Sequence, residues 1–505
     1  MRQRGSPDSV DAHGAGRQRV ATLLAFLRAV MRSFRRALAS AAAGLLVQAT
    51  CIRAHDHHDA VDKVALSAPI DNVLWLHIAL QVMLWGILWP LGMILGLTRS
   101  RWHVPLQATN FALTALGYIL GHVHGGRKFP ESAHEKFANI LLLPLGIMLV
   151  LGIYLKLHIH ERSIRPYAVI AHGIIGRVWP LLAWVQMLFG AIALGGYCGK
   201  EAFDQCAAHY AMGSAFVWYG IFLLLALMLG GWNAWLEQRN LSQEYIDSWV
   251  IMIWGIINTF ALHRGGRWSH KDMQHVSLGV LWWAGGALGI LLSSKGRRTV
   301  VPALLILITG WAMSAHEQAK MISTRVHGMF GIALMGAGVA RIVEICFIDG
   351  RPIANAGWAD AWRMLTPFGL ISGGILFMSA TDEELNFVSS DEVQMDHETY
   401  ILLMFSLGLL VQALGGSLAR AYLTIGRNAP GASQGLKMTG GDSAEYIQLA
   451  PTGGLSSNGH DNGGISYHDN VRDAEQFAIG DEDDEELRSP NPRRKSRDLT
   501  PPREP

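Results

Sequence analysis

The sequence predicts an all-α fold, a polytopic transmembrane helical bundle. Half of its 505 residues are apolar and only 16% are charged, whereas about a quarter of the residues are charged in an average soluble domain. Apolar runs with few charges recur along the chain, and each approaches the roughly 20 helical residues that cross a bilayer core. Strands of a membrane barrel would alternate apolar and polar residues. Because these runs are apolar throughout, helices are the expected element.

The runs predict about eleven spans in chain order. The first four belong to an expected N-terminal four-helix domain over residues 70–200, and the other seven form a second multi-span block over residues 205–426. The expected spans cover residues 72–97, 104–123, 136–157, 169–195, 209–235, 248–263, 275–293, 299–315, 327–348, 364–380 and 400–425.

The two ends of the chain have a different composition. Residues 1–54 resemble a leader, in which RSFRRALASAAAGLLVQA has the charged start, short apolar centre and small residues of a secretory signal peptide. Met31 is an alternative start, and a plain membrane anchor is an alternative reading of the apolar run, although that run is short for a span. Residues 427–505 are rich in Gly, Ser, Pro and acidic residues, which predicts a disordered tail.

Two cysteines give the expected topology. Cys198 and Cys206 lie in YCGKEAFDQCAAH, a short loop between the fourth and fifth spans, at a spacing that a disulfide can close. A disulfide there would face an oxidising lumen or the exterior. Counting spans from this loop places the N-terminus on the same outer side and the tail in the cytosol. The expected location is a secretory-pathway membrane, either the plasma membrane or a vacuolar or other endomembrane.

Each of the first four spans begins with a histidine: His77, His103, His134 and His172. Because the spans alternate in direction, two of these residues lie at the outer face and two at the inner face. Helices two apart are diagonal in a four-helix bundle, so His77 can face His134, and His103 can face His172. Neutral imidazoles on both sides of an iron suit an electron-transfer haem. The alternative is that each histidine is an interfacial residue that reaches the headgroups.

Short motifs in these spans resemble the cytochrome b561 family. The first is LHIALQVMLWGILWPLG at 76–92, and WHVPLQ follows at 102–107. HEKFANILL at 134–142 and AHGIIGR at 171–177 supply the remaining two histidine positions. The resemblance covers about 130 residues.

This resemblance implies an oxidoreductase that resembles ferric reductases and holds two b-type haems. Electrons would pass across the membrane from a cytosolic donor such as ascorbate to an outer or lumenal acceptor such as ferric iron or monodehydroascorbate. Carried over residue by residue, it assigns His77 and His134 to the outer haem iron. His103 and His172 are assigned to the inner one.

The second block departs from that family. The whole chain resembles fungal integral membrane proteins of the Ytp type, which join a b561-like N-terminal half to a distinct C-terminal half. His209 and His275 are expected to form an outer couple on helices two apart, and no histidine replaces His103. The alternative is that His263, His270 and His275 form hydrogen bonds within a polar lumenal loop.

Two other functional classes remain open. A metal or small-solute transporter needs ionisable residues inside the spans, where Arg177, Arg341 and Glu344 are the main examples. A structural or trafficking protein that binds no haem is the third class. The sequence contains no GxxxxGK[ST] motif and no GxGxxG after a strand, so it predicts no nucleotide site. The expected partners are the lipid bilayer and a small donor and acceptor, without nucleic acid.

Basic residues at the inner face are a weaker signal. Arg101, Lys156 and Arg165 would suit docking of an anionic donor, but they fit the positive-inside bias of cytosolic loops equally well. The histidine clusters AHDHHD at 54–59 and LHIH at 157–160 would bind copper or zinc only loosely, and a solvated segment is the expected state of each.

Overall fold

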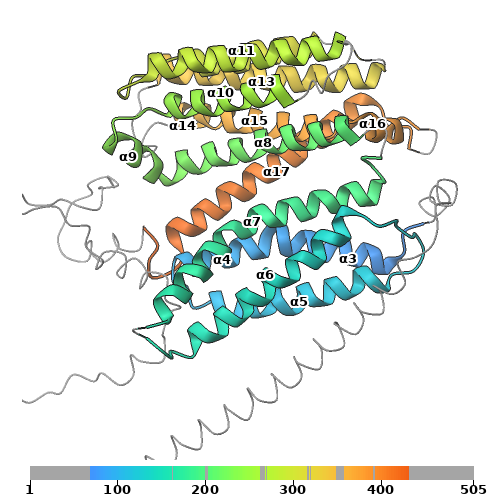
Figure 1. The fold of residues 1–505 in the computed structure, drawn as a ribbon, viewed down its shortest axis with the longest axis vertical. Helices are drawn as coiled ribbons and strands as arrows, with labels where there is room; N and C mark the ends of the chain where they lie inside the picture. The colour runs from blue at the N-terminus through green and yellow to red at the C-terminus, as the bar shows by residue number, and fades with distance from the viewer. Residues whose placement is uncertain are drawn as a thin grey trace, which may run out of the picture. The chain divides into compact units, whose positions relative to one another are not determined.

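The computed structural model describes residues 69–430, with gaps at 162, 200–202, 262–267, 269, 316–317, 319, 349–357 and 391–392. The predicted leader and nearly all of the predicted tail lie outside the described residues. Within these limits every regular element is a helix, which confirms the all-α prediction (Figure 1).

The helices follow one another with short connections. They are α3 (Asn72–Met83), the π-helix η1 (Leu84–Leu88), α4 (Trp89–Leu97), α5 (His103–Val123), α6 (Ala133–Lys156), α7 (Arg165–Gly195), α8 (Phe203–Leu229), α9 (Gly231–Gln238), α10 (Gln243–Ala261), α11 (His270–Ser293), α12 (Val301–Ser314), α13 (Met321–Phe347), α14 (Trp358–Arg363), α15 (Leu365–Met378), α16 (Asp382–Val388) and α17 (His397–Thr424).

Every predicted span coincides with a helix, but not every helix is long and apolar enough to cross a membrane. Eight helical segments among the described residues meet both conditions, and α5, α10 and α12 are not among them. The last of these has only 14 residues. The chain is therefore a polytopic helical membrane protein, and length and composition support eight of the eleven expected spans.

The N-terminal block, α3 to α7, is built from two antiparallel helix pairs. The α3–α4 segment packs against α5, and α6 packs against α7, which also contacts η1 and α4. Trp85, Trp89 and Trp179 meet in the core of this block, each less than 8% exposed. The block therefore has an aromatic centre flanked by helix ends.

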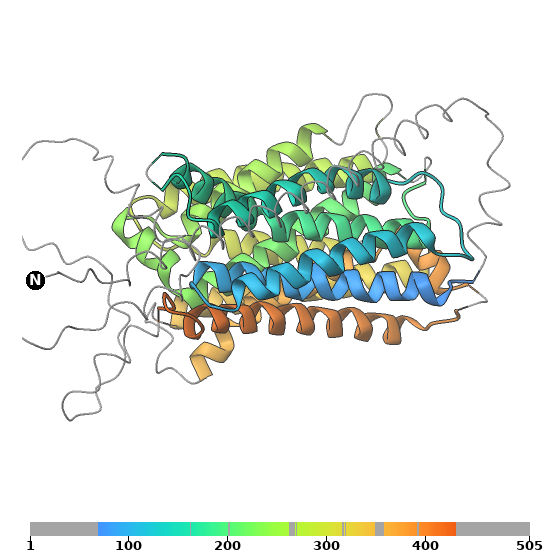
Figure 2. The same ribbon diagram turned by 90° about the horizontal axis from the view of Figure 1, so that it is seen from below.

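The second block, α8 to α17, is organised around α15. This helix packs against α8, α13 and α17, while α10 pairs with α11 and α12 with α13. A Cβ at Gly213 would lie 2.6 Å from the carbonyl oxygen of Gly374, so α8 and α15 approach too closely for any larger residue there. Helix α17 also contacts α4, so it lies beside both blocks (Figure 2).

A π-helical turn interrupts the first span. The backbone N–H of Trp89 donates to the carbonyl oxygen of Leu84, five residues earlier, instead of four. Pro90 follows and has no N–H to offer to the carbonyl of Gly86, which weakens the regular ladder at this turn. Such a turn adds one residue to a helix, and this extra residue affects the register of the histidines.

The loop between α7 and α8 contains the disulfide that the cysteine spacing predicts. Cys198 and Cys206 are bonded, with their Cα atoms 5.2 Å apart. The backbone N–H groups of Cys198 and Gly199 both donate to the carboxylate of Glu383 in α16. The disulfide loop is thus held against the short helix that precedes α17.

Candidate functional site

The four predicted histidines form two facing pairs in the N-terminal block. The ring centres of His77 and His134 are 6.2 Å apart, and those of His103 and His172 are 6.3 Å apart. The rings of both pairs are nearly perpendicular, at 85°. The structure therefore brings together helices one and three at one end and helices two and four at the other.

These histidines lie within the first three turns of their helices. The Asp71 side chain caps α3 by accepting from the N–H of Leu74 at 2.9 Å, and this bond holds the pKa of Asp71 below its ordinary value. Ser132 caps α6 by accepting from the N–H of Glu135. His134 therefore lies in the first turn of α6, as His103 does in α5.

Backbone carbonyls orient three of the four rings. His77 Nδ1 lies 2.7 Å from the oxygen of Gly117, and His103 Nδ1 lies 2.8 Å from that of Gly92. His134 Nδ1 lies 3.2 Å from the carbonyl oxygen of Gln186. A carbonyl oxygen only accepts, so the Nδ1 atoms of His77 and His103 carry the proton and their Nε2 atoms have a lone pair. Metal-binding histidines are held in this way. The Nδ1 of His134 also lies 3.1 Å from the Nε2 of Gln186, an amide nitrogen that only donates, so the contacts of His134 do not select one tautomer.

The fourth ring differs from the others. His172 Nδ1 is buried and has no hydrogen-bond partner in the described part of the chain. A buried imidazole nitrogen without a partner is costly in an apolar site.

Each ring lies against a glycine of the neighbouring helix. A Cβ at Gly121 would meet His77 at 2.7 Å, one at Gly96 would meet His103 at 2.8 Å, and one at Gly190 would meet His134 at 3.2 Å. Gly152 is more distant from His172, at 3.9 Å. Glycine is needed because any side chain at the first two positions would displace the ring.

The same helices carry both groups at a fixed spacing. A glycine follows the histidine by 18 residues in three of them, at His103–Gly121, His134–Gly152 and His172–Gly190. Eighteen residues are five turns of an α-helix, about 27 Å. The histidine at one end and the glycine at the other therefore share one face, and each helix serves both pairs.

In the first span the glycine, Gly96, follows His77 by 19 residues instead of 18. One residue more would rotate the glycine by about 100° away from the shared face. The π-helical turn at Leu84–Leu88 absorbs that residue. The extra residue in the sequence is thus taken up by the π-helical turn, and Gly96 stays on the same face of the span as His77.

The spacing of both pairs fits a metal ion between them. Two metal–imidazole bonds of about 2.0 Å, with roughly 1.1 Å from each nitrogen to its ring centre, would put the centres of two facing imidazoles about 6.2 Å apart. The ring-centre distances of 6.2 and 6.3 Å agree with this value. Imidazoles on both sides of an iron are typical of haem proteins that transfer electrons.

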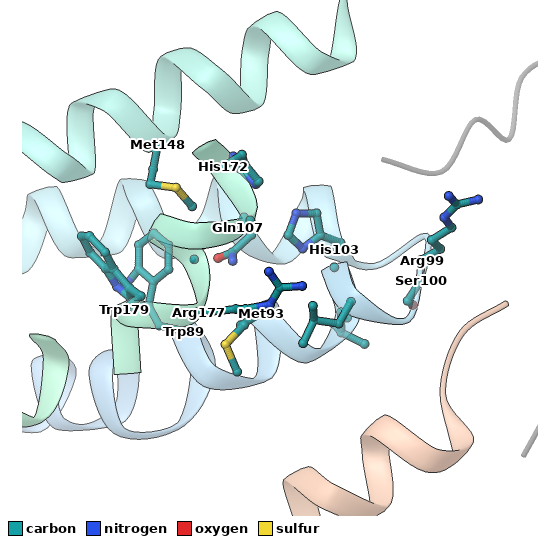
Figure 3. Close-up of a pocket in the computed structure, with 15 residues that line it drawn as sticks. Trp89, Met93, Arg99, Ser100, His103, Gln107, Met148, His172, Arg177 and Trp179 are labelled. Atoms are coloured by element: carbon teal, nitrogen blue, oxygen red, sulfur yellow. The ribbon is translucent and has the colours of Figure 1, made fainter. Parts of the chain in front are cut away.

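A pocket lies between His103 and His172 (Figure 3). Its lining includes the aromatic side chains of Trp89 and Trp179 and two basic residues, Arg99 and Arg177. The basic residues expected at this face are placed elsewhere. Arg101 lies over the ring of Trp102, and Arg165 is largely buried near Glu161, whereas the two arginines of the pocket were not expected to share it.

Other histidines of the N-terminal block take no part in a pair. The ring of His122 bonds to the carbonyl of Tyr118, and that of His158 bonds to Glu161. His124 bonds to the backbone of Gly125. These side chains lie at the ends and loops of the block.

The prediction that His275 faces His209 is wrong. His327 on α13, not His275, faces His209 across the second block, with ring centres 5.7 Å apart. The sequence contained a signal for it, since VHGMFG at 326–331 has the same H-G-x-x-G spacing as AHGIIG at 171–176. His263 lies outside the described residues, as does the side chain of His270.

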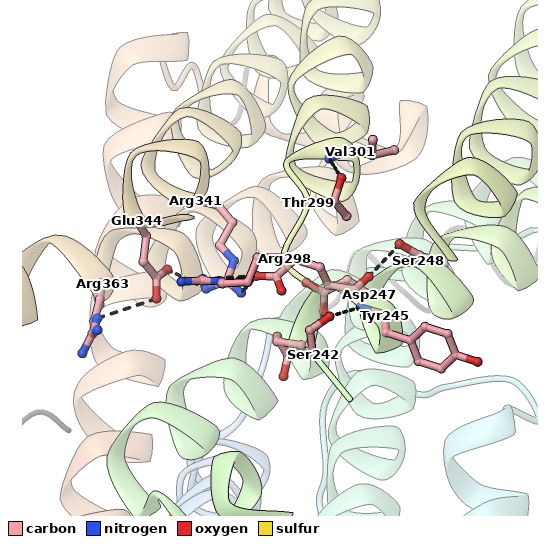
Figure 4. A network of polar contacts seen from close by, with 12 residues as sticks. Ser242, Tyr245, Asp247, Ser248, Arg298, Thr299, Val301, Arg341, Glu344 and Arg363 are labelled. Carbon is pink, nitrogen blue, oxygen red and sulfur yellow. Dashed lines mark hydrogen bonds and ion pairs between the residues drawn. The ribbon is translucent and has the colours of Figure 1, made fainter. Parts of the chain in front are cut away.

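Ionisable side chains meet at the other end of the second block (Figure 4). Glu244 is 1% exposed and accepts from Arg298 at 3.2 Å and from Arg341 at 2.9 Å. Arg341 also bonds to Glu344 at 2.7 Å, and Arg363 lies 3.7 Å from Glu344. Within this network, only Arg341 and Glu344 lie inside an expected span and are predicted from the sequence as buried charges.

Comparisons with known proteins match both halves of the chain. A family model described as "Protein YTP1-like, C-terminal" matches residues 182–419, and a domain of unknown function (DUF2427) matches residues 57–158. Protein YTP1 of Saccharomyces cerevisiae is 46% identical over 237 residues, which cover 46% of this chain and 50% of that protein. The chain thus spans half the length of this relative.

Two further relatives are uncharacterised membrane proteins. One, from Schizosaccharomyces pombe, is 23% identical over 459 residues, covering 64% of this chain and 89% of that protein. The other, from Saccharomyces cerevisiae, is 27% identical over 255 residues, covering 44% and 38%. No solved structure matches the chain. Fold and matches together identify a multi-span membrane protein similar to fungal proteins of the YTP1 type.

Proposed function

We propose that the N-terminal block carries electrons across the membrane through two b-type haems, one at each histidine pair. The observation that supports this most is the repeated arrangement of histidine, carbonyl and glycine at both ends of the block. His77 and His103 donate Nδ1–H to a backbone carbonyl, and the Nδ1 of His134 lies 3.2 Å from another carbonyl oxygen. An interfacial histidine needs none of these contacts, so headgroup binding does not account for them.

The residues of the chain have separate roles in this proposal. His77 and His134 hold the outer haem iron, and His103 and His172 hold the inner one. The glycines let each ring lie close to the neighbouring helix, and the carbonyls of Gly117 and Gly92 fix the tautomers of His77 and His103. A haem iron with two imidazole ligands changes between the ferric and ferrous states and has no open position for oxygen.

The core between the pairs is dry and aromatic. Trp85 stacks on Trp179 with ring centres 5.5 Å apart, and Trp89 lies 5.3 Å from Trp179. These residues exclude water from the space between the two ends, which suits a redox path that must avoid proton leakage. The tryptophans therefore have a role in the proposal beyond packing.

The donor and acceptor belong to the same proposal. Arg99 and Arg177 at the pocket beside His103 and His172 suit an anionic donor such as ascorbate on the cytosolic side. The acceptor would be outside or in the lumen, with ferric iron as the model substrate. A secretory-pathway membrane and a cytosolic tail complete this topology.

Single substitutions test the assignment. His103→Ala and His172→Ala should each remove one haem and spare most of the other, and His77→Ala and His134→Ala should share a second, different phenotype. The measurement is the haem-to-protein ratio with a redox titration of each purified variant. His122→Ala and His124→Ala are matched controls that should retain both haems. Equal haem content in all six variants would overturn the proposal.

A second candidate function has its own observation. The ionic network of the second block contains Glu244, Arg341 and Glu344, all less than 15% exposed at their side chains, and buried charges of this kind often mark solute pathways in membranes. If the protein is a metal or small-solute transporter, the Glu244→Gln variant should lose solute uptake into proteoliposomes, and this loss should not depend on haem content. A structural or trafficking role would require that neither redox nor transport activity be found.

A further inference from the structure

His209 and His327 face each other inside the second block, away from the proposed haem pairs. They lie on α8 and α13 and are 8% and 4% exposed. Their Nε2 atoms are 3.5 Å apart, and the ring planes are nearly perpendicular, at 88°. Two imidazoles from distant parts of the chain thus meet through the same nitrogen.

Hydrogen bonds on the far side of each ring fix the tautomers. His209 Nδ1 lies 2.8 Å from the carbonyl oxygen of Gln205, and His327 Nδ1 lies 2.9 Å from that of Ser323. Since a carbonyl oxygen only accepts, both Nδ1 atoms carry protons. In the neutral rings both Nε2 atoms then present lone pairs to each other. This arrangement is unfavourable unless a positive species lies between them.

A porphyrin does not fit here. Phe377 stacks on the His209 ring with centres 4.5 Å apart and planes at 15°, and it lies 6.3 Å from the centre of His327. This phenylalanine is 4% exposed and belongs to the main apolar core with Phe330. The space beside the imidazoles, where a macrocycle would extend, is filled by side chains.

A small metal ion fits better. Two collinear metal–imidazole bonds of about 2.0 Å each need about 4 Å between the nitrogens, so the 3.5 Å gap would have to open by about 0.5 Å to admit the ion. A proton shared between nitrogens needs a separation nearer about 3 Å. Among the residues that the structure describes, no third His, Cys, Asp or Glu completes a cluster, so the four-ligand set of a zinc site is missing.

We propose that His209 and His327 bind one monovalent copper ion. Copper binds imidazole well, and its monovalent form accepts two nitrogen ligands without an anionic one. A single charge also costs less to bury than a double charge. Asp382, at the start of α16, is close enough to act electrostatically on His209, and it supplies a nearby countercharge.

Copper binding to the full-length protein in detergent tests this proposal. The reduced protein is titrated anaerobically with copper(I) against a chromogenic copper(I) chelator, and bound metal is measured by mass spectrometry. His209→Gln and His327→Gln should each lose about one tightly bound equivalent. His122→Gln, in the N-terminal block, is the matched control and should lose none. Equal copper binding by the wild type and both variants would overturn the proposal, as would a wild type that binds no copper.

X-ray absorption of the copper-loaded wild type needs no substitution. It should show imidazole nitrogen as the ligand, and sulfur scattering would place the copper at a methionine or cysteine and reject the assignment. Haem is measured in the same samples. Unchanged haem in His209→Gln and His327→Gln is expected and shows that the variants fold, whereas loss of a third haem would make the pair a haem site and contradict the copper proposal.

Discussion

The two blocks of the chain hold facing histidines in different surroundings. In the N-terminal block each ring lies against a glycine of a neighbouring helix, and the ring centres are 6.2 and 6.3 Å apart. In the second block the rings are 5.7 Å apart, and one of them stacks on Phe377. Paired imidazoles alone therefore do not define a site. The side chains beside them decide whether a large planar group or a single ion has room.

The largest expected effect concerns the register of the first span. Deleting Ile87, an exposed residue of the π-helical turn, should be tolerated, because it restores the 18-residue spacing found in the other three helices. Deleting Leu116 from α5, which is similarly exposed, should remove haem, because it rotates Gly121 and His103 out of phase by about 100°. Haem per protein in the two purified variants is the measurement. Comparable loss in both would show that the register argument is wrong.

Substitutions of the glycines should have the next largest effect. Gly121→Val would put a side chain into the His77 ring, since even a Cβ would lie 2.7 Å away, and the outer haem should be lost. Gly146→Val on α6 is the control, because a Cβ there has no neighbour within 4 Å. Absorbance spectra and redox titration of both proteins distinguish the outcomes. Retention of two haems in Gly121→Val would show that Gly121 is not required for haem binding.

The ionic network should affect stability more than haem content. Arg341→Met leaves Glu244 with only Arg298, and breaking a buried ion pair costs about 3–5 kcal/mol. Thermal unfolding in detergent should therefore occur several degrees lower, with haem bound per folded protein unchanged. Arg297→Met is the control, because this neighbouring arginine is exposed and its hydrogen bonds in the described structure go to Leu291 and Ser294, close to it in the sequence. Equal stability of the two variants would show that the ionic network does not stabilise the fold.

A smaller effect is expected from Glu384 in α16, the short helix before α17. Burial raises the pKa of this carboxyl to about 7, although a hydrogen bond from Tyr400 opposes the shift. The folded state then binds the proton more tightly than the unfolded state, so stability is highest at low pH and declines between about pH 4.5 and 7. Glu384→Gln should reduce this slope. Unfolding midpoints at several pH values measure it, and an unchanged slope in the variant would contradict the assignment.

The sequence predicted the helices and the first-block pairs because both follow from regular spacing. One histidine at the start of each span, alternating in direction, is enough to pair His77 with His134 and His103 with His172. The structure adds a glycine beside each ring and a backbone carbonyl near the Nδ1 atom of three of them. The copper and haem assignments remain proposals for experiment.

Other features depend on contacts between distant segments. Spacing along the chain does not predict that His327 faces His209, because the two residues are 118 positions apart in the sequence. Glu244 and Arg298 likewise appear as ordinary helix-end charges until the fold places α10 beside α12 and the segment that precedes it. The count of eleven spans treated every apolar run alike, while α12 has only 14 residues.

The haem content of the purified wild-type protein tests the central claim most directly. The account predicts two b-type haems per chain, with a low-spin spectrum typical of two imidazole ligands and two separate midpoints in a redox titration. Ascorbate should reduce at least one of them. A protein that is folded, as judged by its helical circular dichroism, and that binds no haem when expressed with a full haem supply would contradict the account.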